Sequence, residues 1–413
     1  MKYLVITQQL DETIKILDEE SYTRHFMKYI QNVIVRGCRF GRNLRVFWYF
    51  GENCYQHLKE IRFEYIHFNS GQMLCIQKHL ENVKTVTFTS CQIDGNIYNN
   101  FLVYCPEIQH LVFARTEIRC NDADVWLSGE CPKLESFHLK IRRKTDCVYW
   151  NKFFEQNPNV ARLSTILLEG DHPVMRQMCR QIATRAVKLK RLCLSVSEDF
   201  ECDAIKEELK DLNDKESFEQ LEMEFDGSHI ESLTQSDHLF SILKKFKGIY
   251  FDSVAVTTGL FTSIDKITSV KTLNWEYVKS NHLSYLSFNE KKIEKSVNNL
   301  ENILFRSSQA LVDETIRFFL SKLSKLKMIV VYGYLTTGQI IRLDEFLRKC
   351  SEIELGGKRP VDVFVCHLSP NDVKLLLATD NNRRLFKLKI FTDEQRYNFF
   401  RENPFIQHLD PGY

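Results

Sequence analysis

Apolar residues recur along this chain at relative positions 1, 4 and 6 of short segments whose starts lie 24 to 30 residues apart. The segments start at residues 30, 58, 83, 108, 134, 160, 189, 218, 246, 270, 300 and 326. Ile108, Leu111 and Phe113 form one such set. Successive side chains of a strand point to opposite faces, so positions 4 and 6 share a face. The pattern predicts one strand per segment, with that face buried.

The spacers between these strands carry helix and turn signals. Cys105-Pro106, Cys131-Pro132 and Asn157-Pro158 recur every 26 residues, each just ahead of a strand, where proline ends the preceding helix and favours an extended chain. Val174, Met178 and Ile182 follow one another at steps of four, and the same step recurs within 312–320. This spacing is typical of one face of a helix. Each unit is therefore a strand, a turn and a helix.

No single unit of this kind can bury its own apolar face, so neighbouring units must stack. The expected fold is an α/β solenoid curved like a horseshoe, with a parallel β-sheet on the concave face and helices on the convex face. Residues 1–345 form about 13 units, because Met1, Leu4 and Ile6 already match the strand pattern. Residues 346–413 carry looser repeats that continue the same solenoid.

The strings CPEIQHLVF (105–113) and CPKLESFHL (131–139) resemble the cysteine-containing leucine-rich repeats of F-box proteins in the ubiquitin system. The resemblance implies a right-handed leucine-rich-repeat solenoid and the substrate-recognition part of an SCF-type ubiquitin ligase. The Cys or Asn that the family carries at relative position 9 is present as Cys38 and Cys91, whereas Ile66 and Thr116 stand there in other units. No F-box-like segment precedes the repeats, so binding of Skp1 and cullin is expected only if an F-box lies upstream.

Positions 3, 5 and 7 of each strand are expected to face solvent on the concave side, where a protein ligand would bind. The early units place a threonine ladder there, Thr85, Thr87 and Thr89. The candidate partner-binding residues are His110, His138, Arg162, Arg191, Glu222, Glu224, Tyr250, Asp252, Asn274 and Glu276. They run from weakly basic to acidic, and segment 198–226 holds thirteen Asp or Glu against three Lys. Tyr250 is the expected aromatic anchor, since aromatic residues supply much of the energy of protein interfaces.

Composition removes several other classes of function. The formal net charge of +2 implies no bulk attraction to nucleic acid or to an anionic membrane, and no stretch approaches the length of a membrane span. Thirteen cysteines without a secretion signal or a C-x-x-C pair suggest free thiols in the cytoplasm or nucleus. Cys105 and Cys131 occupy equivalent positions, which favours small buried side chains. We expect a monomer.

The sequence contains no motif for catalysis, for a cofactor or for a metal. GxSxG, HExxH and Walker patterns are missing. The histidines are scattered, although His110 and His138 fall on adjacent predicted strands. The favoured hypothesis is a protein-interaction scaffold. The alternative is a leucine-rich-repeat regulator or inhibitor of an enzyme or GTPase without a ubiquitin role, and nucleic-acid binding is a remote third.

Overall fold

The computed structural model describes residues 3–6, 29–37, 57–68, 80–119, 129–141, 150–166, 172–196, 206–226, 246–252, 272–275, 301–306, 327–332, 341, 345, 361–365 and 386–390. The chain divides into two compact units. The first unit comprises Met1–Ile166 and Pro173–Leu192, and the second comprises Leu167–His172 and Cys193–Tyr413. Each unit is described by itself below.

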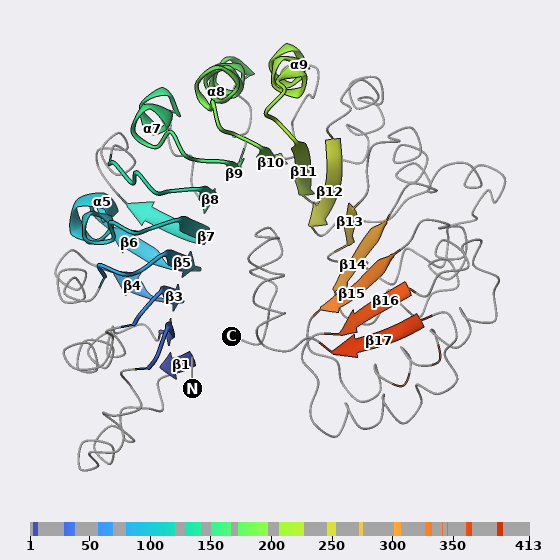
Figure 1. Cartoon of the computed structure of the whole chain (residues 1–413), viewed down its shortest axis with the longest axis horizontal. Helices are drawn as coiled ribbons and strands as arrows, with labels where there is room; N and C mark the ends of the chain where they lie inside the picture. The colour runs from blue at the N-terminus through green and yellow to red at the C-terminus, as the bar shows by residue number, and fades with distance from the viewer. Residues whose placement is uncertain are drawn as a thin grey trace. The chain divides into compact units, whose positions relative to one another are not determined.

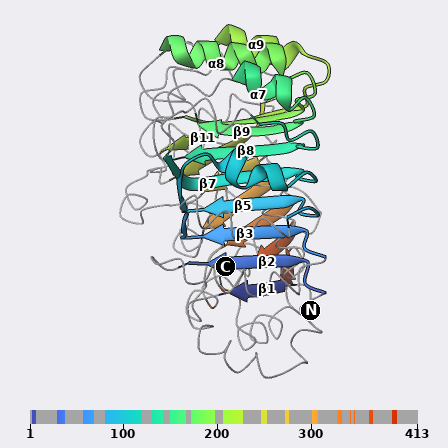
Figure 2. The same ribbon diagram turned by 90° about the vertical axis from the view of Figure 1, so that its left-hand side faces the viewer.

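The first unit is built on a ladder of parallel strands (Figures 1 and 2). In order along the ladder these strands are β1 (Tyr3–Ile6), β2 (Asn32–Arg36), β3 (Glu60–Glu64), β5 (Thr85–Thr89), β7 (His110–Arg119), β8 (Ser136–Ile141) and β9 (Arg162–Ile166). Two short strands, β4 (His67–Phe68) and β6 (Gln92–Asp94), form a second small sheet with the end of β7, in which β4 pairs with β6 and β6 pairs with β7.

The second unit continues the same pattern of one parallel strand per repeat. Its strands are β11 (Gln220–Asp226), β12 (Phe246–Asp252), β13 (Thr272–Trp275), β14 (Asn302–Arg306), β15 (Met328–Tyr332), β16 (Val361–Val365) and β17 (Phe386–Ile390). Strand β10 (Arg191–Val196) begins in the first unit and ends in the second. Pairing is regular on both sides of residue 345, and the boundary expected there stays a prediction.

The register is set by a recurring hydrogen bond just ahead of each strand. The carbonyl oxygen of Gln31 accepts two backbone N–H groups of the next repeat, from Lys59 at 2.8 Å and from Glu60 at 3.1 Å. Equivalent carbonyls at 59, 84, 109, 135 and 161 each accept two donors in the same way, and so does the carbonyl of Glu301 in the second unit. One shared acceptor per repeat holds the strands in line, because a slip by one residue would turn every side chain to the other face.

Helices connect the strands. They are α5 (Ile97–Asn100), the short 3-10 helix η2 (Leu102–Tyr104), α7 (Trp150–Gln156), α8 (His172–Arg185) and α9 (Lys206–Asp214). In the first unit α5, α7 and α8 lie on one side of the strand ladder (Figure 1). Helix α8 buries Cys179, Ile182 and Ala183, which confirms the helix predicted around Ile182. The helix predicted within 312–320 lies outside the described residues.

The predicted core is confirmed wherever the structure describes it. The sets at 30, 58, 83, 108, 134, 189 and 218 are buried at positions 1, 4 and 6. Phe63, Phe88 and Phe113 stack on one another from repeat to repeat, with ring centroids 5.3 and 5.2 Å apart. In this continuous apolar row each ring covers the next, so the burial of one repeat depends on its neighbours. The chain is an α/β leucine-rich-repeat solenoid.

The turns ahead of the strands explain the Cys-Pro and Asn-Pro pairs. Cys105, Cys131 and Asn157 are all buried. The Oδ1 of Asn157 accepts a hydrogen bond from the backbone N–H of Cys131 at 2.8 Å, and its Nδ2 donates to the carbonyl of Phe153 at 2.9 Å. Burial raises the pKa of the Cys131 thiol to about 12 and raises the pKa of the Cys105 thiol. Both cysteines are therefore packing residues, as their equivalent positions predicted.

Candidate functional site

The strands of the first unit present a second face, opposite the core, which we call the inner face. The register arranges its side chains in rows that cross the strands. The first row holds Asn32, Glu60, Thr85, His110, Ser136 and Arg162. The middle row holds Ile34, Arg62, Thr87, Val112, His138 and Ser164.

The middle row is buried, so the expectation that it faces solvent is wrong. Every member is at most 8% exposed, and Thr87 is only 1% exposed. His138, predicted as a surface contact, is 2% exposed, and Glu222 in the second unit is 1% exposed. The physical reason lies in the register. Neighbouring strands of a sheet are about 4.8 Å apart, so each side chain in the middle of a row is covered by the ones beside it.

Buried charges lie in and beside the middle row, towards the end of β3. The carboxylate of Glu64 accepts a hydrogen bond from the Nε of Arg36 at 2.8 Å. The Nε of Arg62 lies 2.7 Å from the other carboxylate oxygen. Glu64 and Arg62 are buried, whereas Arg36 is about one third exposed. The carboxylate of Glu64 is thus paired with both guanidinium groups in a structural cluster, since a buried charge must be paired to be tolerated.

The first row is accessible from β7 onward. His110 and Ser136 are half-buried and Arg162 is exposed. The backbone N–H of Arg191 donates to the carbonyl of Ala161 at 3.0 Å, as that of Arg162 does to Glu135 one repeat earlier. Half-buried Arg191 therefore follows Arg162 in the same row. Three of the predicted partner-binding residues, His110, Arg162 and Arg191, thus form one continuous strip.

In the second unit the backbone aligns the remaining predicted residues only in part. Glu224 is in register with Tyr250, and Tyr250 with Asn274. Asp252 is in register with Asp226 instead, two positions further along the strands. Glu276 lies outside the described residues. The expected grouping of an acidic row around Tyr250 therefore stays a prediction, although the register places Glu224, Tyr250 and Asn274 in one row.

His110 and His138 lie on adjacent strands, as predicted, but in different rows. Ser136 is in register with His110, and His138 is in register with Val112. The two histidines are therefore offset by two positions. Among the described residues no group of three or more His, Cys, Asp or Glu side chains is arranged to hold a metal ion.

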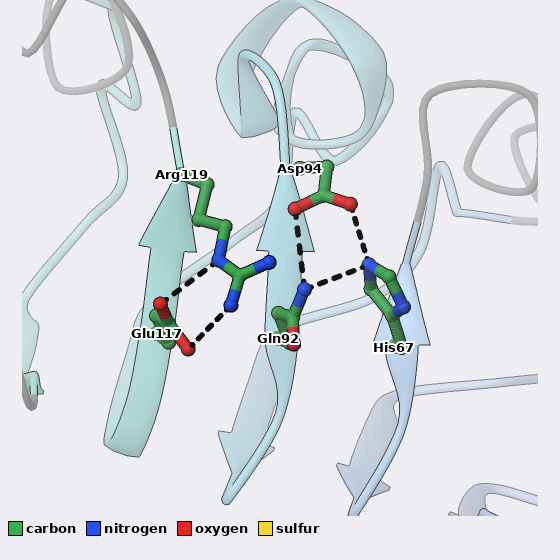
Figure 3. A network of polar contacts seen from close by, with 5 residues as sticks. All are labelled: His67, Gln92, Asp94, Glu117 and Arg119. Carbon is green, nitrogen blue, oxygen red and sulfur yellow. Dashed lines mark hydrogen bonds and ion pairs between the residues drawn. The ribbon is translucent and has the colours of Figure 1, made fainter. Parts of the chain in front are cut away.

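A second polar surface, which we call the turn edge, lies where the strands end (Figure 3). His67 Nε2 lies 2.5 Å from Asp94 Oδ2 and 3.0 Å from Gln92 Nε2. Arg119 donates two hydrogen bonds to Glu117, at 2.8 and 3.3 Å. Sequence reasoning missed this network, which joins a histidine to a carboxylate of the next repeat. A signal existed, because residues 67, 92 and 117 are polar and equally spaced.

The turn edge depends on a bend that follows β3 and β5. Tyr65 and Ser90 have positive φ angles of 54° and 51°, a region that non-glycine residues rarely occupy. The next residue in each turn enters the core. The hydroxyl of Thr116 donates to the carbonyl of Phe88 at 3.0 Å, and the thiol of Cys91 donates to the carbonyl of Phe63 at 3.4 Å. Threonine thus replaces cysteine at relative position 9.

Burial raises the pKa of the Cys91 thiol to about 12, so this cysteine is not an activated nucleophile. None of the helices among the described residues has the length and apolar character needed to cross a membrane.

No protein-family model and no curated protein sequence matches this chain. Among solved structures it resembles an internalin from Listeria monocytogenes, at 11% identity over 94% of this chain and 96% of that one, with a TM-score of 0.37. It also resembles the yeast Rad7 and Elc1 complex, at 12% identity over 78% and 83% with a TM-score of 0.40. PEPR1 with AtPEP1 matches at 11% identity over 89% of this chain and 64% of that one, with a TM-score of 0.23.

Proposed function

We propose that this protein is a non-catalytic interaction scaffold that binds a protein ligand along the first row of the inner face. The observation that carries the proposal is the strip formed by His110, Ser136, Arg162 and Arg191. These side chains come from successive repeats and are accessible, whereas the middle row beside them is buried. Neighbouring residues of the strip are one strand spacing apart, about 4.8 Å, which suits an extended segment or a helix that lies across the strands.

The charge of the strip indicates an acidic ligand. Arg162 and Arg191 occupy neighbouring strands, so a ligand carboxylate that lies between them can contact both. Guanidinium groups also bind carboxylates through two parallel hydrogen bonds, which gives both strength and orientation. His110 at the other end of the strip adds a polar contact that gains a positive charge when protonated.

Charge reversal in the strip tests this proposal. Tagged wild-type protein and the R162E/R191E variant are used to capture proteins from cells that express the chain, and the bound proteins are quantified by mass spectrometry. The matched control is K59E/K84E, which makes the same change of charge at exposed residues of the same unit. We expect partners that are lost with R162E/R191E and kept with K59E/K84E. Equal capture by all three proteins contradicts the proposal.

A more specific role follows from the resemblance of residues 105–113 and 131–139 to repeats of F-box proteins. In that role the bound ligand is the substrate of an SCF-type ubiquitin ligase. Co-purification of Skp1 and cullin from the full-length protein, together with ubiquitylation of the captured partner, is the expected result. The alternative is a regulator or inhibitor of an enzyme or GTPase. One stoichiometric client without Skp1 or cullin favours that alternative.

A further inference from the structure

The accessible strip of the first row has a fixed spacing, and a ligand that contacts several of its residues must match it. His110, Ser136, Arg162 and Arg191 stand one per strand on β7, β8, β9 and β10. The register and the shared carbonyl hydrogen bonds place them in one row. Neighbouring strands are about 4.8 Å apart, so the four positions span about 14 Å.

The strip also has two different ends. In the two main strands before β7 the same row holds Glu60 and Thr85, which are at most 8% exposed. The accessible part therefore begins at His110. At its other end Arg162 and Arg191 put two positive charges on neighbouring strands, so the strip is most positive on β9 and β10.

The spacing of the strip favours a helix over an extended segment. Side chains on one face of an extended segment lie about 6.7 Å apart, so three steps cover about 20 Å. Successive turns of a helix rise by about 5.4 Å, so three turns cover about 16 Å. The mismatch with the strip is therefore about 2 Å for a helix and about 6 Å for an extended segment. Flexible side chains take up the first difference more readily than the second.

We infer that the ligand of the first row is an acidic helix that lies across the strands, with two carboxylates four residues apart that contact Arg162 and Arg191. Residues at that spacing on a helix have Cβ atoms about 5–6 Å apart, close to one strand spacing. A guanidinium group has five N–H donors, so an arginine that already bonds within its own chain can still bind a ligand carboxylate. The inference rests on the function proposed above and adds the conformation of the ligand.

The charge of the strip also gives this helix a direction. The C-terminal end of a helix carries a partial negative charge and its N-terminal end a partial positive charge. The C-terminal turns of the ligand should therefore lie over Arg162 and Arg191, and its N-terminal turns over His110. Two glutamates four residues apart repel each other in the free helix, and contact with two arginines offsets that repulsion.

Peptides that differ in the spacing of two glutamates test the inference on the full chain. The probe is a fluorescein-labelled peptide rich in Ala and Gln, with two Glu four residues apart near its C-terminus. The matched control has the same composition but carries the two Glu two residues apart. That spacing puts them on one face of an extended segment but on different sides of a helix.

Fluorescence anisotropy at low salt, where surface charges are least screened, measures both affinities. We expect the probe to bind about tenfold more tightly than the control, since it alone reaches both arginines as a helix. A third peptide, in which proline replaces a residue between the two glutamates of the probe, should lose this advantage because proline breaks the helix.

Variants of the strip link the preference to its residues. R162E/R191E should remove the difference between probe and control, whereas K59E/K84E, with the same change of charge at exposed residues of the same unit, should keep it. R162Q/R191Q adds no acid and should show a smaller loss in the same direction. Thermal melts check that each variant folds.

The outcomes separate this inference from the proposed function. A control peptide that binds as tightly as the probe, or more tightly, would overturn the inference. The proposed function would still stand if R162E/R191E lost its partners. If R162E/R191E bound both peptides and captured the same partners as the wild type, both would be wrong. Equal losses of probe binding in R162E/R191E and K59E/K84E would show that only bulk charge matters, which also overturns the inference.

Discussion

In the first unit, the core side of the strands and the middle row of their inner face are buried to a similar extent but are built differently. The core side is a continuous apolar row, in which Phe63, Phe88 and Phe113 stack at 5.2–5.3 Å. The middle row of the inner face is equally covered, yet it holds Arg62, Thr87 and other polar groups. The alternation of apolar and polar residues along a strand therefore indicates which face of the sheet a side chain is on. The exposure of that side chain depends on the side chains beside it in the neighbouring repeats.

The largest effect is expected on the core side. Phe113→Ala should lower the free energy of unfolding by about 4 kcal/mol, because it removes a buried ring that covers Phe88 and leaves a cavity. Urea unfolding followed by circular dichroism measures the loss. The matched control is His110→Ala at the start of the same strand, which should cost less than about 1 kcal/mol because His110 is only half-buried. Equal losses at the two positions would contradict the assignment of the two sides.

Particular residues show how far the sequence predicts this structure. Positions 1, 4 and 6 located the core, because burial of a whole row requires apolar side chains in every repeat. The steps of four around Ile182 located α8. The same reasoning failed for His138 and Glu222, because their burial depends on the side chains next to them across the strands. The pair of His67 with Asp94 was missed because it requires the short strands β4 and β6 to align, and a strand of two or three residues is too short to show alternation. The equal spacing of residues 67, 92 and 117 was the available signal.

The next largest effect concerns the buried charges of the inner face. Glu64→Ala should cost about 3 kcal/mol, since it leaves the buried guanidinium of Arg62 without the carboxylate 2.7 Å away. The comparison is sharpened by the double variant E64L/R62M, which replaces both charges by apolar groups and should recover much of the loss. Thermal or urea unfolding of the three proteins checks the order. A double variant less stable than Glu64→Ala would contradict a purely structural role for the cluster.

A smaller effect distinguishes two buried threonines. The hydroxyl of Thr116 donates to two backbone carbonyls, of Phe88 and Ala114, at 3.0 and 3.2 Å. The hydroxyl of Thr87 is buried and makes no hydrogen bond. Thr116→Val should therefore destabilise the fold by about 1 kcal/mol. Thr87→Val should be neutral or stabilising, because it removes a buried polar group that has no partner.

The two threonine variants are compared by urea unfolding under identical conditions. Both substitutions exchange a hydroxyl for a methyl group of similar size, so packing changes little and the difference reports the hydrogen bonds. A loss at Thr87 as large as that at Thr116 would show that the middle row is a solvated or hydrogen-bonded surface, as the sequence alone suggested.

The smallest effect on stability is expected in the first row, where the effect on binding should be greatest. Arg162 is exposed, so Arg162→Ala should change the free energy of unfolding by less than about 0.5 kcal/mol. If the first row binds an acidic ligand, the same substitution removes a charge-assisted contact and should weaken capture of that ligand by about tenfold. Unfolding and capture measured on the same preparation separate the two effects. Loss of a residue that stabilised the sheet would lower stability and capture together, whereas we expect Arg162→Ala to lower capture alone, because Arg162 is exposed.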